Sequence, residues 1–247
     1  MSVISKSAAF RLLFGLVLCF AWSMAAHADG MRVAVASNFV VVAKQVAAAF
    51  EADTGHTVTL IAGSTGKHAV QIQHGLAVDL LLAADAERPR LLEDLGLIVP
   101  DTRVSYAFGR LALWQPKGGT PSPQTLSSRS RTTLALANPK LAPYGQAAEQ
   151  VLSKLDPSAH LKRVYGENVA QAYQFVYSGN AQLGLVAYAQ VQAEPPSSYW
   201  LVPTSLHAPI EQQMVLLSDS PAGRAFWQYL QSEKALELIR EHGYDTP

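Results

Sequence analysis

Four segments of the sequence place small, polar or Gly/Pro residues where a helix is expected to begin. They are Ser37-Asn38, Ser64-Thr65-Gly66, Pro143-Tyr144-Gly145 and Asn168-Val169. The first N–H groups of a helix have no acceptor within the helix, and the helix dipole adds partial positive charge there. If these starts face one cleft, they offer an anion several neutral donors and little counter-charge. Ordinary N-capping by Ser37, Ser64 and Asn168 explains the same residues and, judged by cap frequency alone, is the commoner role.

Other kinds of chemistry find little support in the residue spacing. Gly63 to His68 is similar to part of a phosphate-binding loop, but Ile61 stands at the place of its first glycine and His68 at that of its Ser/Thr. The histidines are scattered, and none pairs with a carboxylate at metal-ligand spacing, which argues against zinc. Ser64 lacks the context of a nucleophile elbow, which argues against a serine hydrolase.

The elements that would position the four helix starts alternate along the chain. Apolar or β-branched runs indicate strands at 32–36, 57–61, 79–83, 106–114, 133–137, 183–187 and 210–217. Helical spacing follows each of the four starts, and a last helix is expected over 222–242. This alternation favours an α/β fold with mostly parallel sheets flanked by helices. Ligands of such folds bind at the carboxyl ends of the strands, where the helix starts lie.

The composition is that of an ordinary globular protein. The 247 residues are 49% hydrophobic and 15% charged, which excludes a disordered chain and a collagen-like repeat. Nineteen basic and nineteen acidic residues cancel, so no overall field points to nucleic acid as a partner. The single cysteine, Cys19, excludes an internal disulfide bond and a cysteine-rich metal site.

Residues 1–28 have the features of a secretory signal peptide. Lys6 and Arg11 supply the positive start, and the apolar run from Leu12 to Trp22 is too short to span a bilayer comfortably. Ala26-His27-Ala28 fits the small-x-small cleavage pattern. We therefore expect cleavage after Ala28 and export to the periplasm, with an uncleaved N-terminal anchor as the alternative.

Chain breaks divide the remaining sequence into two expected lobes. The breaks cluster near Ala107-Phe108 and again near Ala208-Pro209, which suggests that the chain crosses twice between the lobes. The first lobe would comprise residues 29–107 plus 209–247. The second lobe, residues 108–208, would be inserted into the first.

Six motifs occur in an order that is typical of one protein family. They are Val35 to Phe39, Gly63 to Gly66, Val78 to Asp85, Asn138 to Gly145, Gly166 to Ala172, and Gln182 to Ala187. Each motif is weak alone, whereas the ordered set, which covers nearly all of Met31 to Tyr244, is specific. Together they resemble the periplasmic molybdate-binding proteins, the solute receptors of molybdate ABC importers. The resemblance implies a two-lobed type II periplasmic-binding fold that closes on molybdate or tungstate.

The resemblance also implies which residues hold the oxyanion, with no direct cation ligands. Ser37 would donate through its hydroxyl and N–H, and Asn38 through its N–H. In the second turn, Thr65 is expected to be the direct donor and Ser64 its neighbour.

In the second lobe, Tyr144 and Val169 would each donate a backbone N–H to the oxyanion. One branch of the family completes the site with a tyrosine where this sequence has Ala187. Tyr188 lies one step further and, in a strand, would face the opposite side. The sequence is similar to the other branch, with a tyrosine in the Ala-Pro-Tyr-Gly turn. Whether the Tyr144 hydroxyl also contacts the ligand stays open.

The function implied by the resemblance is transport rather than catalysis. The ligand would be molybdate or tungstate, the partner the membrane permease of an ABC importer, and the receptor a monomer without a cofactor. Neutral, fixed donors disfavour protonated anions, and cavity size would have to distinguish molybdate from the smaller sulfate. Two alternatives fit the sequence as well: a receptor of the same fold for another oxyanion such as sulfate or chromate, and an exported hydrolase supported only by the serine turn.

Overall fold

The computed structural model describes residues 30–127, 131–157 and 161–247. The predicted signal peptide and its cleavage site after Ala28 lie outside these residues. Within the described part of the chain, no helix has the length and apolar character needed to cross a membrane.

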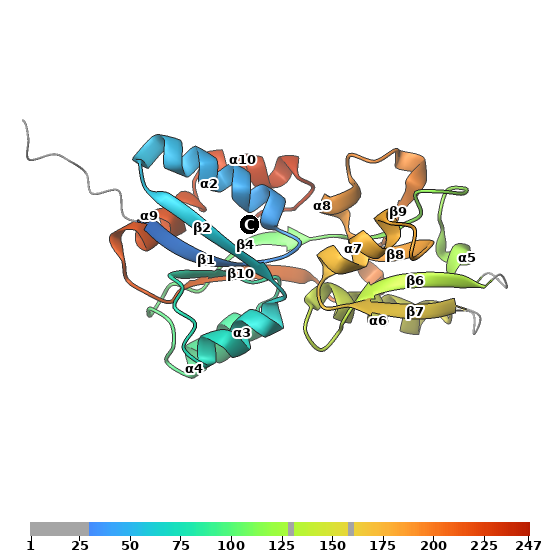
Figure 1. The fold of residues 1–247 in the computed structure, drawn as a ribbon, viewed down its shortest axis with the longest axis horizontal. Coiled ribbons are helices and arrows are strands. Elements are labelled where there is room, and N and C mark those ends of the chain that lie inside the picture. The colour runs from blue at the N-terminus through green and yellow to red at the C-terminus, as the bar shows by residue number, and fades with distance from the viewer. Residues whose placement is uncertain (1–29, 128–130, 158–160) are drawn as a thin grey trace, which may run out of the picture.

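Two five-stranded sheets organise the molecule into two lobes, which lie side by side in Figure 1. The first lobe contains β1 (Gly30–Ala36), β2 (Thr57–Gly63), β3 (Leu80–Leu82), β4 (Val104–Gly109) and β10 (Ile210–Leu216). The second contains β5 (Leu111–Trp114), β6 (Thr132–Ala137), β7 (Leu161–Gly166), β8 (Leu183–Ala187) and β9 (Tyr199–Leu201).

The two sheets have the same topology. Their strand orders are β2-β1-β3-β10-β4 and β7-β6-β8-β5-β9. In each sheet the fourth strand, β10 or β5, is antiparallel to both neighbours, so the other four strands point the same way. The predicted fold class, two mostly parallel sheets flanked by helices, is confirmed.

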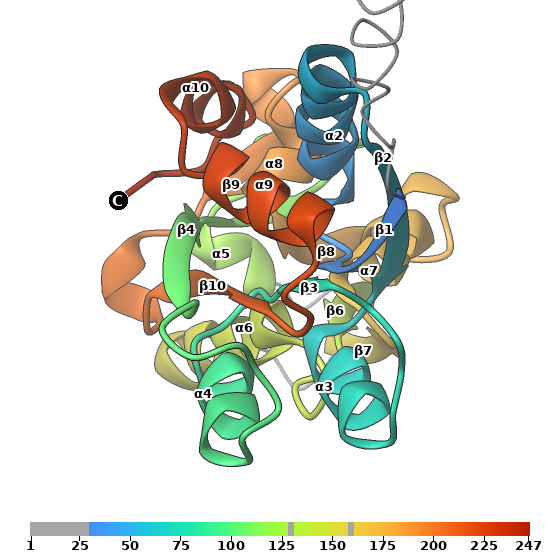
Figure 2. The ribbon, with the colours of Figure 1, turned by 90° about the vertical axis from the view of Figure 1, so that its left-hand side faces the viewer.

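Helices cover both faces of the first sheet, as Figure 2 shows. On one face lie α2 (Val40–Thr54), α9 (Pro221–Tyr229) and α10 (Glu233–Glu241), and on the other α3 (Thr65–Gln73) and α4 (Glu87–Asp94). Side chains alternate along a strand, and β1 shows the result. Val33 and Val35 pack in the core cluster of α2, whereas Ala34 packs with residues of α3 and α4.

The second lobe has its own core, which includes Trp114, Leu136 and Val151. Its helices are α5 (Pro123–Leu126), α6 (Pro143–Leu155), α7 (Val169–Tyr177) and α8 (Tyr188–Val191), with short 3-10 turns at Pro196–Ser198 and Thr204–Leu206. The helix α8 corrects one expectation, because Tyr188 begins a helix and does not continue the strand β8.

Two elements predicted as continuous are each divided in the structure. The expected strand 106–114 is split into β4 and β5, which belong to different sheets, because the chain passes between the lobes from Gly109 to Leu111. It returns between Leu201 and Ile210. The expected helix 222–242 is two helices, and the Ser232 side chain accepts a hydrogen bond from the Ala235 N–H to begin the second. The strands β7 and β9 were not predicted.

Candidate functional site

The four predicted helix starts occupy equivalent positions in the two lobes. In the first lobe, the turns after β1 and β2 lead into α2 and α3. In the second lobe, the segments after β6 and β7 lead into α6 and α7. Because β1 and β6, and likewise β2 and β7, hold the same places in their sheets, each lobe contributes the same pair of carboxyl-terminal turns.

A backbone hydrogen bond joins the two turns within each lobe. The Ser37 N–H donates to the Gly63 carbonyl oxygen at 2.8 Å, and the Asn138 N–H donates to the Gly166 carbonyl oxygen at 2.8 Å. The first bond corrects the prediction that the Ser37 N–H donates to a ligand. The Ser37 hydroxyl and the Asn38 N–H are the predicted donors left in this turn.

Direct contacts also join the turns of one lobe to those of the other. The Gly66 N–H, at the start of α3, donates to the Leu141 carbonyl oxygen at 2.9 Å. A Cβ at Gly66 would lie 2.9 Å from the same oxygen, so the close approach needs glycine. The Lys67 ammonium and the Glu167 carboxylate form an ion pair at 3.0 Å. The four turns therefore meet at the junction of the lobes.

Two hydroxyl groups of the first lobe are held at this junction by backbone donors. The Ser64 hydroxyl caps α3 by accepting from the Lys67 N–H at 3.4 Å, so its role as an N-cap is confirmed. The Thr65 hydroxyl accepts from the Ala84 N–H at 2.9 Å. Both residues are almost fully buried. Because each oxygen acts as an acceptor in these bonds, its own hydrogen is available for donation.

The second lobe presents backbone N–H groups instead of hydroxyls. Pro143 begins α6, where its fixed φ suits the first helical position, and Tyr144 follows in the first turn. Val169 is the first residue of α7, and the Asn168 side chain caps this helix by accepting from the Gln171 N–H at 3.1 Å. First-turn N–H groups have no intrahelical acceptor. These two helices can therefore donate to an anion through Tyr144 and Val169.

The Tyr144 side chain points into a hydrogen-bonded cluster at the crossing between the lobes. Its hydroxyl accepts from the Gln212 side-chain amide at 3.5 Å and interacts with the Tyr244 hydroxyl, whose own hydrogen is donated to the Asn38 carbonyl oxygen. Burial raises the pKa of Tyr144 well above its ordinary value, so the hydroxyl stays protonated. The hydrogen of this hydroxyl is therefore used by Tyr244.

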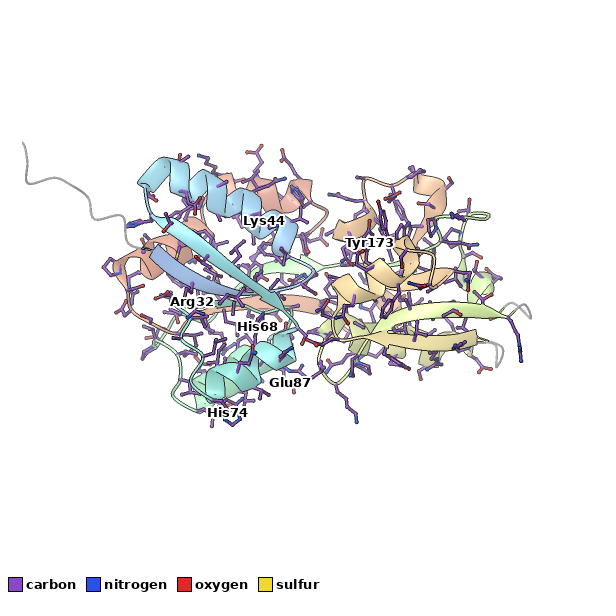
Figure 3. The ribbon with its side chains drawn as sticks, in the orientation of Figure 1. Arg32, Lys44, His68, His74, Glu87 and Tyr173 are labelled. Carbon is purple, nitrogen blue, oxygen red and sulfur yellow. The ribbon has the colours of Figure 1, made fainter. Side chains whose placement is uncertain are left out.

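An interlobe cavity of about 570 Å³ adjoins part of this junction. Ser37, Asn38 and Asn168 line it together with residues of α2, α7 and α8. One of these is Tyr173, labelled in Figure 3, whose ring stacks on Trp114 at a centroid distance of 4.8 Å. Ser64, Thr65, Tyr144 and Val169 are not among the lining residues. The cavity therefore gathers only part of the predicted donor set.

Sequence reasoning missed Leu141, Gln212 and Tyr244, which contact the predicted turns. Leu141 acts through its carbonyl oxygen, which any residue provides. Gln212 lies in a strand otherwise recognised by its apolar residues, and Tyr244 follows the last helix. The polar run Glu211-Gln212-Gln213 inside this strand was the one available signal, and it does not distinguish Gln212 from its neighbours.

Comparison with known proteins gives consistent results. Residues 31–245 match the family model described as bacterial extracellular solute-binding protein. The chain is 43% identical over 240 residues to the molybdate-binding protein ModA of Azotobacter vinelandii, with 93% of each chain covered. It is 38% identical over 237 residues to ModA of Rhodobacter capsulatus, with 94% of each chain covered.

Among solved structures, the periplasmic molybdate-binding protein of Azotobacter vinelandii superposes with a TM-score of 0.81 at 34% identity. The alignment covers 88% of this chain and 99% of that structure. The likeness therefore includes both lobes and both crossings between them.

Proposed function

The chain belongs to the bacterial extracellular solute-binding proteins, and on that premise we propose that it captures molybdate between its lobes for delivery to the permease of an ABC importer. The observation that carries this proposal is the 43% identity to a molybdate-binding protein over 93% of both chains. The relatives are solute-binding proteins of transport systems, so the chain is a receptor and not an enzyme.

The donor chemistry of the junction supports an oxyanion ligand. Each charge-assisted hydrogen bond contributes about 1.5–3 kcal/mol, so several fixed donors can outweigh the desolvation of a dianion. The ammonium of Lys67 is paired with Glu167, which leaves the junction close to neutral. A neutral set of donors disfavours a protonated anion, whose own O–H would need an acceptor.

The proposed ligand set takes donors from both lobes. The first lobe would supply the hydroxyls of Ser37 and Thr65 and the N–H of Asn38, with Ser64 as their neighbour. The second lobe would supply the N–H groups of Tyr144 and Val169. Because the two groups belong to different lobes, an anion that binds both favours the closed arrangement.

Tungstate is proposed as a second ligand, because it has the same shape and charge as molybdate. The receptor is proposed to be a periplasmic monomer, released by cleavage after Ala28. The relative solved as a periplasmic molybdate-binding protein supports this location. N-terminal sequencing of the exported protein should begin at Asp29, and a native mass measurement should give one chain.

Calorimetric titration of the exported protein tests the ligand. Molybdate and tungstate should each bind at one site per chain, and an excess of sulfate should not displace them. A ligand present at 100 times its Kd should add about 2.7 kcal/mol to the free energy of unfolding. Preferential binding of sulfate, or no binding of molybdate, would refute the proposal.

A further inference from the structure

A cluster of buried polar side chains lies where the chain passes from the first lobe to the second. We call it the crossing cluster; its members are Asn38, Tyr144, Gln212 and Tyr244. All four are at most 4% exposed. Buried polar groups are stable only when they are hydrogen-bonded. Their mutual bonds therefore fix the positions of the segments that carry them.

The Tyr244 hydroxyl joins the two lobes through one oxygen atom. It donates to the Asn38 carbonyl oxygen at 2.8 Å and accepts from the Asn38 side-chain amide at 3.1 Å. The Tyr144 hydroxyl interacts with the same oxygen, and because the Tyr244 hydrogen is used by Asn38, Tyr144 is the donor in this pair. Asn38 lies in the turn after β1 of the first lobe, whereas Tyr144 lies in the first turn of α6 of the second. Both residues carry proposed backbone donors to the anion.

Gln212 supports the same connection from the strand β10. Its Oε1 accepts from the Asn38 amide at 2.9 Å and from the Tyr106 hydroxyl at 3.2 Å. Its Nε2 lies 3.5 Å from the Tyr144 hydroxyl, at the long limit for a hydrogen bond. The register between β10 and β4 shifts between Gln212 and Gln213. Such irregularities change the direction of side chains beside functional sites.

The backbone at the crossing is adapted to this cluster. A Cβ at Gly109 would collide with the Tyr144 hydroxyl and would lie 2.8 Å from the Gln212 amide nitrogen. Gly109 is the last residue of β4, directly before the chain enters the second lobe. A side chain at this position would displace Tyr144 or Gln212, so glycine allows both to approach the crossing.

We infer that the Tyr244 hydroxyl, supported by Gln212, is a specificity-determining spacer that fixes the distance between the donors of the two lobes and thereby favours molybdate over sulfate. The inference rests on the proposed function. Sulfate is smaller than molybdate, so donors held apart for the larger ion cannot all reach the smaller one. Without the spacer, the lobes can settle at another separation.

Two Tyr→Phe substitutions, each of which removes one buried hydroxyl group, test this spacer. Tyr244→Phe removes the hydroxyl that joins the lobes. Tyr106→Phe is the matched control, because Tyr106 is also buried and its ring also meets Phe39 edge-on. Within the described residues, the Tyr106 hydroxyl donates to the Ala83 carbonyl oxygen and to Gln212, both in the first lobe. The two variants therefore lose the same group but differ in what it connects.

The readout is the ratio of the Kd for sulfate to the Kd for molybdate, with urea unfolding of the ligand-free protein measured beside it. Tyr244→Phe should lower this ratio about tenfold, as expected when one well-placed hydrogen bond is lost. Tyr106→Phe should keep the ratio within about twofold, while the two variants lose similar stability. If Tyr244 only stabilises the fold, Tyr244→Phe should lower the free energy of unfolding and leave the ratio of the two Kd values unchanged.

Gln212→Met provides a second measurement if Tyr244→Phe folds poorly, and Gln213→Met is its control. Gln213 is the adjacent residue and is also buried, but it bonds Arg103, Ser105 and Glu211. The ratio should fall in Gln212→Met only. An unchanged ratio in a folded Tyr244→Phe or Gln212→Met protein overturns the inference, whereas loss of molybdate binding by the unaltered protein overturns the proposed function.

Discussion

The two lobes present the same pair of turns with different chemistry. In the proposed ligand set, the first lobe supplies hydroxyls as well as the Asn38 N–H, whereas the second supplies only the backbone N–H groups of Tyr144 and Val169. In both lobes a 2.8 Å backbone bond ties the two turns together. Equivalent topology therefore fixes where the proposed donors lie, while the sequence of each turn decides which atoms are able to donate.

This difference determines how each lobe can be altered. A hydroxyl can be removed by a substitution that leaves the backbone in place. Every residue except proline has a backbone N–H, so a substitution does not remove this donor. The donors of the second lobe must therefore be tested by displacing the start of their helix. Four experiments use this contrast, in order of decreasing expected effect on molybdate affinity.

Gly145→Ala should have the largest effect, because it displaces the helix start of the second lobe. A Cβ at this position would collide with the Ala137 carbonyl oxygen and would lie 2.8 Å from the Pro139 nitrogen. Overpacking costs about 1–3 kcal/mol of folding stability, and the loss of the displaced Tyr144 donor costs about 1.5–3 kcal/mol of binding free energy. Calorimetry should show molybdate affinity reduced about 100-fold or more.

The control for this helix start is Gly119→Ala, where a Cβ would meet no atom within 4 Å. The molybdate affinity of Gly119→Ala should equal that of the unaltered protein. If Gly145→Ala folds and binds molybdate normally, the start of α6 does not supply a donor.

Thr65→Val should weaken molybdate binding about 10-fold to 100-fold, since it deletes one charge-assisted donor of the first lobe. Thr102→Val is the matched control. Thr102 is another buried threonine whose hydroxyl accepts a backbone N–H, that of Leu216, at 3.2 Å. Both variants should lose stability in urea unfolding, but only Thr65→Val should lose affinity. Equal affinities would remove Thr65 from the ligand set.

Lys67→Met should reduce molybdate affinity about twofold to fivefold at low salt, because it breaks an exposed ion pair that joins the lobes. The difference should disappear at high salt, where the pair is screened. Lys234→Met breaks a comparable pair with Asp53 that lies within the first lobe, and it should leave affinity unchanged. A salt-independent loss in Lys67→Met would contradict an electrostatic contact between the lobes.

His68 should make the first lobe sensitive to acid while leaving molybdate affinity at neutral pH unchanged. Its ring fills the space beside Gly63, and burial, aided by the charge of Lys67, lowers the pKa of His68 below its ordinary value of 6.5. Below pH 6.5 the unfolded chain therefore binds a proton that the folded protein does not accept. Stability is full above this pH and falls as the pH decreases toward the folded pKa.

Urea unfolding at a series of pH values measures this effect in His68→Gln and His74→Gln. His74 lies at the other end of α3 and is exposed (Figure 3). The His68 variant should lose part of the pH dependence below pH 6.5, and the His74 variant should keep it. The equivalent position in α7 is Ala172, so no such dependence is expected from that helix start.

The sequence by itself determined most of the alternation of strands and helices and three of the four helix starts; the first helix begins only at Val40, after the predicted Ser37-Asn38. These features are local, because apolar periodicity and capping residues act over a few neighbouring positions. Ser64 and Asn168 could be recognised as caps for this reason. The order of the six motifs was sufficient to indicate the family, since the comparisons show the same relatives along nearly the whole chain.

Only the tertiary structure decided how these starts meet. The run 106–114 is apolar except at Gly109 and Arg110, and this local break does not show that the strands on its two sides belong to different sheets. The direction of the Tyr144 hydroxyl depends on Gln212 and Tyr244, which lie 68 or more positions away in the sequence. Buried polar atoms must find partners wherever the fold places them, and no spacing rule connects residues that only folding brings together.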